Sequence, residues 1–199
     1  MELSEALRRR RMVRAFRTDP VDPPALERVL AAATRAPSAG STQALDLLVL
    51  EGRSETERYW ALTFPDPDAR AAFRWQGLFT APVLVVPVVD PAAYPSRYRE
   101  PDKAATGLGA LDAWPVPYWW VDGGAAVENL LLAAVEEGLG ALLFGLFGAE
   151  AAVLGSLGVP SGRRALGTVA LGHPAPDEPG GSSARPRRPL AEVVHRGRW

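Results

Sequence analysis

The sequence predicts one globular domain in which helices and β-strands both occur. A length of 199 residues suits a single domain with a substantial core, and 47% hydrophobic with 23% charged residues is typical of a globular protein. Helix-start signals and helical apolar spacing recur along the chain, and short runs rich in valine and leucine lie between them. We therefore expect one domain over residues 1–199, without internal repeats.

The composition excludes several kinds of chemistry. The chain has no cysteine, which excludes disulfides, thiolate nucleophiles, iron–sulfur clusters and cysteine-bound zinc. Its two histidines, His173 and His195, make a histidine metal site or a serine–histidine hydrolase a poor fit, so we expect no metal site. The start of the chain lacks the apolar region of a secretory signal, and no window of about 18 apolar residues occurs. We expect a cytoplasmic protein with no membrane segment.

Arginine is concentrated at both ends of the chain. Residues 1–20 carry six arginines and residues 183–199 carry five, although the net charge is −1. Arginine is the better bidentate ligand for phosphate. The run from Arg8 to Arg11 can also contact nucleic acid, but the chain is slightly acidic and shows no nucleic-acid-binding motif, so we expect no such partner.

The first third of the chain predicts two helices, a loop and a strand. A short helix is expected from Ser4 to about Arg11. A second helix begins with Asp22 as N-cap and Pro23 at its first position, and ends before Pro37. A loop of small residues with free backbone N–H groups follows. Residues 45–51 predict a buried strand.

The middle of the chain predicts a helix, a strand and a long excursion. The helix is expected over residues 67–79 and the strand over 82–90, where Pro87 favours an edge position. Residues 91–121 are rich in proline and aromatic residues. Because disordered segments lack aromatic residues, we interpret this region as a lid or a partner-clasping excursion, with disorder as the alternative.

A long apolar helix is predicted from Asp122, as N-cap, to a C-terminal Gly138. A helix that is apolar on nearly all sides is buried on nearly all sides, so we infer that a second subunit covers part of it. The alternative is the central helix of a monomer. The glycine-rich stretch after it suits a backbone that approaches a flat ligand closely. A short helix ending at Gly155 or Gly158, a buried strand over 165–172 and an extended tail over 174–199 complete the prediction.

Four motifs resemble those of the FMN-dependent nitroreductase family in order and spacing. They are RRRMVRAF (9–16), APSAGSTQA (36–44), DGGAAVENLLLAAVEEGLGALLFG (122–145), and LGHPAP with RPRRPLAEVV (171–194). The segment WPVPYWWVDGGAA is most similar to an actinobacterial branch whose substrates are mostly unassigned. The resemblance implies an α+β fold with a mixed sheet flanked by helices. It also implies an obligate homodimer with FMN at the interface, reduced by NAD(P)H in a ping-pong route.

The resemblance also implies which residues bind the cofactor. The phosphate and ribityl chain would lie near arginines from both termini, the partner subunit would supply a loop, and backbone N–H groups after the central helix would bind flavin N5 and O4. These residues are Arg10, Arg11, Met12, Arg14, Arg185 and Arg187; Pro37, Ser38, Ala39, Gly40 and Ser41; and Phe144, Gly145 and Leu146.

Four positions depart from the family pattern. Ser41 replaces the usual asparagine, Ala44 the usual proline, Leu45 a common aromatic residue, and Met12 a small hydroxyl residue. These losses make the deazaflavin F420 an alternative cofactor. Candidates for the substrate wall, with core packing as the alternative interpretation, are Arg74, Tyr98, Trp114, Tyr118 and Trp119.

The predicted function is transfer of a hydride from NAD(P)H, through flavin N5, to a nitroaromatic, a quinone or a similar conjugated acceptor. No catalytic side chain is expected, because the flavin carries the chemistry. One alternative is a protein that binds or sequesters flavin or F420 with little turnover. Another is oxidation of a substrate with oxygen as the acceptor.

Overall fold

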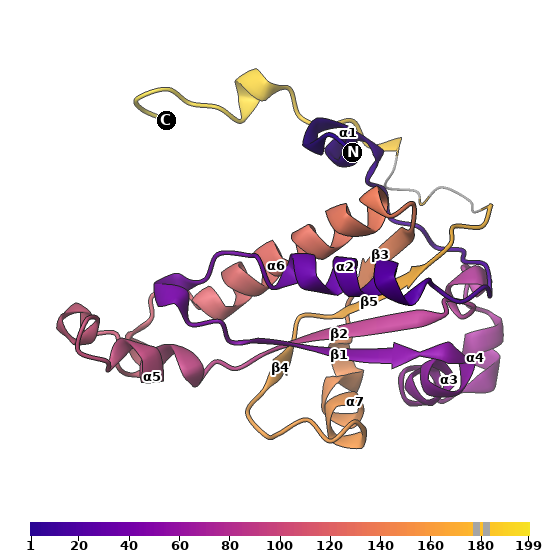
Figure 1. The fold of residues 1–199 in the computed structure, drawn as a ribbon, viewed down its shortest axis with the longest axis horizontal. Coiled ribbons are helices and arrows are strands. Elements are labelled where there is room, and N and C mark those ends of the chain that lie inside the picture. Colours follow the sequence, from indigo (N-terminus) through magenta and orange to yellow (C-terminus); the bar gives the residue numbers. More distant parts are fainter. Residues whose placement is uncertain (177–179, 181–183) are drawn as a thin grey trace.

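The computed structural model describes residues 1–176, 180 and 184–199. At its centre lies a five-stranded sheet with the strand order β1-β2-β5-β3, and β4 pairs with β2 (Figure 1). All pairings between these strands are antiparallel, and one isolated parallel bridge joins Met12 to Ala141. The strands are β1 (Leu45–Glu51), β2 (Val83–Val89), β3 (Gly140–Phe144), β4 (Arg164–Ala165) and β5 (Thr168–Gly172).

Helices flank the sheet on both faces. Helices α2 and α6 lie side by side over one face, and α3 and α7 lie on the other side (Figure 1). The predicted fold class, an α+β fold with a sheet flanked by helices, is confirmed. The helices are α1 (Leu3–Arg9), α2 (Pro23–Ala33), α3 (Gly52–Thr63), α4 (Pro67–Ala71), α5 (Ala93–Tyr98), α6 (Tyr118–Glu136) and α7 (Glu150–Ser156).

The two faces of the sheet have different cores. Side chains alternate along β2, so that Val83 and Val85 face α2 and α6 whereas Leu84 and Val86 face the other side. We call the first side the aliphatic face, because its buried side chains are valine, leucine and alanine. We call the second the aromatic face, since its core includes Phe16, Tyr59 and Trp60, with Phe64, Phe73, Phe79 and Phe144 packed against it.

The ends of α2 and α6 test three predictions. Asp22 accepts a hydrogen bond from the Ala25 backbone N–H at 3.2 Å, which confirms it as the N-cap of α2. Asp122 as N-cap of the central helix is wrong, since α6 begins at Tyr118 and its N-cap residue is Pro117. Gly138 has φ 71°, which confirms the predicted left-handed glycine at the end of α6.

Other element predictions need correction. The helix over 67–79 stops at Ala71, because the Gln76 side chain donates hydrogen bonds to the backbone carbonyls at the helix end. The first helix ends at Arg9, two residues earlier than predicted. Strand β1 is only partly buried, since it forms the edge of the sheet. Helix α3 was not predicted at all.

Pro87 does not place its strand at an edge. Strand β2 is fully buried and has neighbours on both sides. Its pairing with β5 reaches Val85 and its pairing with β4 begins at Val88, so Pro87 lies opposite the gap between β4 and β5. A missing N–H costs little at such a gap.

Residues 91–121 form an ordered excursion that projects at one end of the molecule (Figure 1). It contains α5, two short 3₁₀ turns and the approach to α6. Its ring contacts, with centroids 4.7–5.9 Å apart, join Tyr94, Tyr98, Trp114, Tyr118 and Trp119. Whether it acts as a lid stays a prediction.

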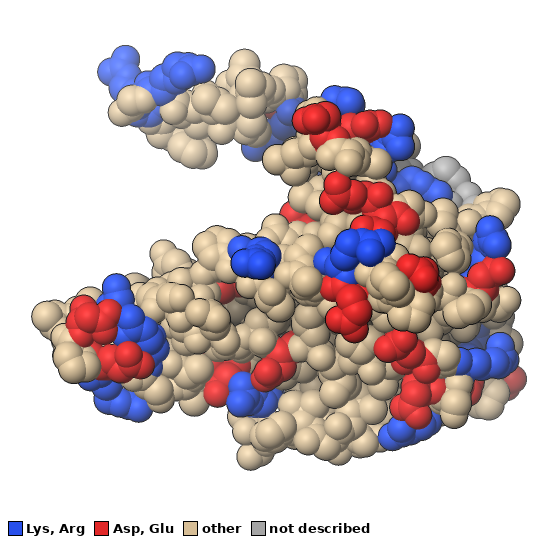
Figure 2. Space-filling view, viewed as in Figure 1, with Lys and Arg blue, Asp and Glu red and all other residues tan. Residues whose placement is uncertain are grey.

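The C-terminal tail projects from the body of the molecule (Figures 1 and 2). Residues 184–199 are exposed, and Trp199 is 99% exposed. The predicted extended linker falls partly on residues 177–179 and 181–183, outside the described part of the chain. Gly158, with φ 71°, ends α7 as predicted. Among the described residues, no helix has the length and apolar character needed to cross a bilayer.

Candidate functional site

A pocket of about 750 Å³ opens on the aromatic face, at the end of β3. It is lined by four of the predicted cofactor residues: Arg14, Phe144, Gly145 and Leu146. Its remaining wall combines aliphatic and small residues with several aromatic ones, among them Tyr59, Trp60, Phe64, Phe73 and Trp75. The volume is in the range of pockets that bind cofactors and drug-sized ligands.

Arg14 reaches this pocket because its segment runs beside β3. Met12 forms a bridge with Ala141, and the Val13 backbone N–H donates to the Ala141 carbonyl at 2.9 Å. The Arg14 guanidinium donates to the Met12 carbonyl at 3.1 Å and lies 5.2 Å from the centroid of the Trp75 ring. Two distant motifs of the sequence therefore meet at one place.

Buried aromatic contacts fix the position of the β3 end. The Phe144 ring stacks on Trp60 with centroids 5.7 Å apart and an interplanar angle of 15°. Next to it, the Tyr59 hydroxyl and Thr168 Oγ1 share a buried hydrogen bond of 2.8 Å. Burial raises the pKa of the Tyr59 hydroxyl, so this group stays protonated. We infer that Phe144 is held in one place by the core.

Gly145 follows as an exposed backbone segment at the pocket. A Cβ atom built on Gly145 would lie 2.7 Å from the Phe147 ring, so a side chain at position 145 would collide with that ring. Phe147 is 92% exposed and has φ 40°, a strained value for a bulky residue. Backbone strain of this kind concentrates at functional sites.

The other N-terminal candidates lie near Arg14 but do not line the pocket. Arg10 Nε is 3.2 Å from Glu128 Oε1, an ion pair by distance. The same buried Nε makes no hydrogen bond, because the two groups are poorly aligned. Arg11 is exposed and Met12 half-buried.

The loop of residues 37–43 lies at a separate pocket of about 190 Å³. Pro37 and Ser38 line this pocket together with Tyr94 and Asp122. The expectation of free backbone N–H groups is wrong for most of the loop: their acceptors are Asp122 Oδ2 for Ala39, the Ser38 carbonyl for Ser41, the Ala39 carbonyl for Thr42 and Ser38 Oγ for Gln43. Within a single chain, this loop therefore lies away from the pocket that Arg14 lines.

The tail arginines and the substrate candidates also lie elsewhere. Arg185 and Arg187 are exposed in the tail and do not line the large pocket. The candidates Tyr98, Trp114, Tyr118 and Trp119 belong to the aromatic cluster of the excursion. Arg74 lies beside the pocket, with its guanidinium 5.5 Å from the centroid of the Trp75 ring.

Sequence reasoning missed the aromatic wall of the pocket. Helix α3 supplies Tyr59 and Trp60, and the segment after α4 supplies Phe73 and Trp75. A signal for α3 was present, because Thr56, Tyr59, Trp60 and Thr63 follow the i, i+3, i+4, i+7 spacing of one helix face.

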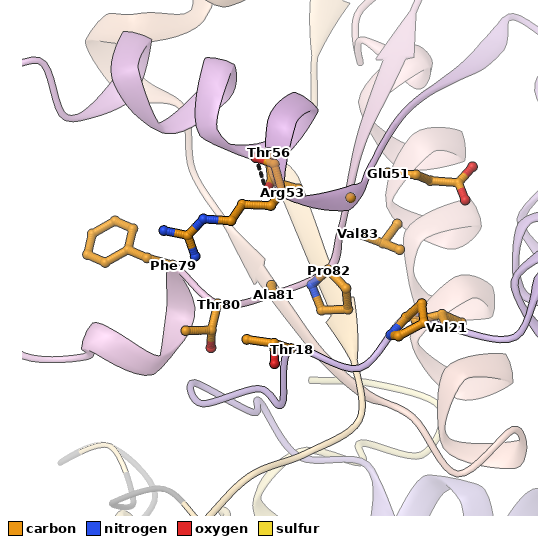
Figure 3. Close-up of a pocket in the computed structure, with 12 residues that line it drawn as sticks. Thr18, Val21, Glu51, Arg53, Thr56, Phe79, Thr80, Ala81, Pro82 and Val83 are labelled. Carbon is orange, nitrogen blue, oxygen red and sulfur yellow. Dashed lines mark hydrogen bonds between the residues drawn. The ribbon is translucent and has the colours of Figure 1, made fainter.

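A smaller cleft of about 250 Å³ lies at the start of α3 (Figure 3). It is lined by Thr18, Glu51, Arg53 and Thr56, and Thr56 Oγ1 donates to the Arg53 carbonyl at 3.3 Å. None of the predicted cofactor residues lines it. We therefore regard the larger pocket as the candidate site.

Comparison with known families agrees with the fold and the motifs. The model of the nitroreductase family matches residues 7–173, so the chain belongs to this family of oxidoreductases. A relative from Archaeoglobus fulgidus, provisionally named NADH dehydrogenase/NAD(P)H nitroreductase, is 29% identical over 196 residues, which cover 96% of this chain and 94% of the relative.

Solved structures show the same fold. A nitroreductase-like protein from Desulfovibrio desulfuricans, crystallised in complex with FMN, is 26% identical with a TM-score of 0.69, covering 98% of this chain and 95% of that one. A protein from Clostridium acetobutylicum, provisionally named an NADH oxidase, is 22% identical with a TM-score of 0.69, covering 100% of both chains. The second similarity concerns the fold alone.

Proposed function

We propose that this protein is an FMN-dependent oxidoreductase that uses NAD(P)H to reduce nitroaromatic, quinone or similar conjugated acceptors. The observation that carries the proposal is the meeting of Arg14 with Phe144, Gly145 and Leu146 in one pocket. The family and the FMN complex of the Desulfovibrio desulfuricans relative support the choice of cofactor.

The residues present fit FMN. Arg14 lines the pocket, and Arg10, whose buried Nε makes no hydrogen bond, lies four residues before it, so we expect both guanidinium groups to contact the phosphate. Charge-assisted hydrogen bonds of this kind contribute about 1.5–3 kcal/mol each. Arg185 and Arg187 would join them if the tail folds over the cofactor, which stays a prediction. The aromatic side chains of the wall suit contact with a planar ring system.

The protein's own part in the reaction would be binding, orientation and electrostatics. When bound, FMN would supply hydride transfer between the nicotinamide and the acceptor. The backbone N–H groups of Gly145 and Leu146 would stabilise negative charge on the ring system. Trp60 and Trp75 would exclude water from one side of the pocket. We assign no catalytic acid or base.

We propose a homodimer as the active form. The loop of residues 37–41 resembles a family loop that contacts the flavin from the partner subunit. In this chain the loop lies away from the pocket that Arg14 lines. Phe147 in the candidate site and Leu190 in the tail are 92% and 73% exposed, which suits burial by a second copy.

Purification without added cofactor tests the proposal. We expect a yellow dimer that releases FMN on denaturation, identified by mass, and that oxidises NADH or NADPH when a nitrofuran or a quinone is added. A colourless 21.3 kDa monomer that takes up no FMN would overturn the proposal. Release of F420 would replace the cofactor, and bound FMN without turnover would favour a sequestering protein.

A further inference from the structure

We propose that Asp122, Tyr94 and Arg97 are positioning residues that hold the loop of residues 37–43 in one shape. The excursion of residues 91–121 would then act as a brace for this loop. The inference rests on the proposed function, in which the loop contacts FMN bound mainly to a second copy of the chain.

The loop adopts an unfavourable backbone shape. Gly40, Ser41 and Gln43 all have positive φ angles, of 60°, 56° and 52°. Glycine tolerates this left-handed region, but serine and glutamine rarely adopt it. Two such non-glycine residues within three positions persist only where surrounding contacts hold the backbone.

One carboxylate oxygen ties the loop to two other elements. Asp122 Oδ2, on α6, accepts the backbone N–H of Ala39 at 2.8 Å and the hydroxyl of Tyr94, on α5, at 2.8 Å. Tyr94 is 1% exposed, and burial, together with its bond to Asp122, raises the pKa of its hydroxyl. The hydroxyl therefore stays a hydrogen-bond donor, and the loop, α5 and α6 meet at a single atom.

A second contact holds the loop from the excursion side. Arg97 Nε donates to the Gly40 carbonyl at 2.9 Å. The same guanidinium is fixed by Asp102 through two hydrogen bonds of 2.7 Å each. The Tyr98 ring packs against Gly40, where a built Cβ atom would come within 2.7 Å of it. The brace therefore sets both the path of the loop and the need for glycine at position 40.

The brace also determines what the loop can offer to a ligand. The backbone N–H groups of Ala39, Ser41, Thr42 and Gln43 all donate within the protein. Among the backbone N–H groups of residues 39–43, that of Gly40 is the one without a hydrogen bond to any described residue. A loop ordered before binding loses less conformational entropy on binding, so removing the brace should weaken the affinity for FMN.

Two measurements on the full-length protein test the brace. Hydrogen exchange of residues 37–44 is followed in flavin-free protein, and the Kd for FMN is measured by flavin fluorescence. For Asp122→Ala we expect faster exchange in this loop and a Kd raised about tenfold to a hundredfold, as for loss of a charged hydrogen bond. Asp122→Asn should be intermediate, because its amide oxygen still accepts a weaker, neutral bond.

Conservative variants keep the test decisive if Asp122→Ala fails to fold. Tyr94→Phe removes only the hydroxyl, and Arg97→Lys loses the paired contacts to Asp102. Both should shift exchange and Kd in the same direction. Asp112→Asn is the control, because Asp112 is exposed in the same excursion and has no hydrogen bond among the described residues. It should behave as wild type.

Wild-type loop exchange and FMN affinity in Asp122→Ala or Tyr94→Phe would overturn the brace. So would a loss of thermal stability with unchanged FMN affinity and exchange that rises evenly over the sheet. A wild-type protein that binds no FMN would instead overturn the proposed function. The loop exchange would then still decide whether these residues hold the loop.

Discussion

The two faces of the sheet share the same strands but differ in the type of side chain that they bury. The aliphatic face is closed by α2 and the 19-residue α6, and its side chains are valine, leucine and alanine. The aromatic face is covered by α3 and the seven-residue α7 and contains the pocket of about 750 Å³. The pocket opens at the end of β3, and the side chains of Tyr59, Trp60 and Trp75 are among those that line it.

We infer that the aliphatic face mainly contributes to the stability of the fold, whereas the aromatic face provides the ligand-binding pocket. Small aliphatic side chains interdigitate under α2 and α6, which favours tight packing. On the aromatic face several rings meet edge to face, with centroids 5.0–6.3 Å apart, and the pocket opens beside them. A substitution on the aliphatic face should therefore change the free energy of unfolding, whereas one at the pocket should change ligand binding.

The largest expected effect is on the aliphatic face. Leu130 is 0% exposed, so Leu130→Ala should lower the free energy of unfolding by about 2–5 kcal/mol, since it leaves a cavity between α6 and the sheet. Urea denaturation measures this change. Leu111→Ala, at a 48% exposed leucine, is the matched control. A large change in the Kd for FMN of the folded variant would contradict the separation.

Arg14→Ala tests the pocket side of the comparison. Loss of one charge-assisted bond to phosphate should raise the Kd for FMN about tenfold to a hundredfold. The free energy of unfolding should change less than in Leu130→Ala. Fluorescence titration with FMN measures the Kd, and Arg8→Ala, at an exposed arginine of α1, provides the control. Equal Kd values for the two variants would remove Arg14 from the proposed site.

The smallest effect concerns Tyr59 and its response to pH. Tyr59→Phe should cost about 1 kcal/mol at neutral pH, because the hydrogen bond to Thr168 is lost. The pKa of Tyr59 is raised in the folded protein. The contribution of the protonated hydroxyl to the free energy of unfolding is therefore present below the ordinary tyrosine pKa of about 10 and is lost as pH rises above it.

Denaturation measured across the pH range separates the effect of the lost hydrogen bond from the effect of tyrosine ionisation. The wild type should lose stability above about pH 10, and Tyr59→Phe should reduce that loss. Tyr94 has a raised pKa for the same reason, so the Tyr59→Phe and Tyr94→Phe double variant should reduce it further. An unchanged alkaline loss in the double variant would show that other groups cause it.

Sequence patterns predicted much of the fold but less of the site. The N-cap of α2 and the glycines that end α6 and α7 depend on local backbone chemistry, and these predictions are confirmed. The prediction of Asp122 as an N-cap is wrong, although an aspartate before an apolar run is a common N-cap. Its carboxylate binds a loop and a tyrosine that lie far away in the sequence.

The sequence by itself determined the family, the order of its motifs and most strands and helices, because periodicity, caps and glycines are local properties. Only the tertiary structure decided that Arg14 meets Phe144 and Gly145 beside Trp60, and that the 37–43 loop lies at another pocket. The physical reason is that a pocket is formed by segments distant in sequence. Their meeting depends on strand pairing and on side-chain packing across the whole sheet.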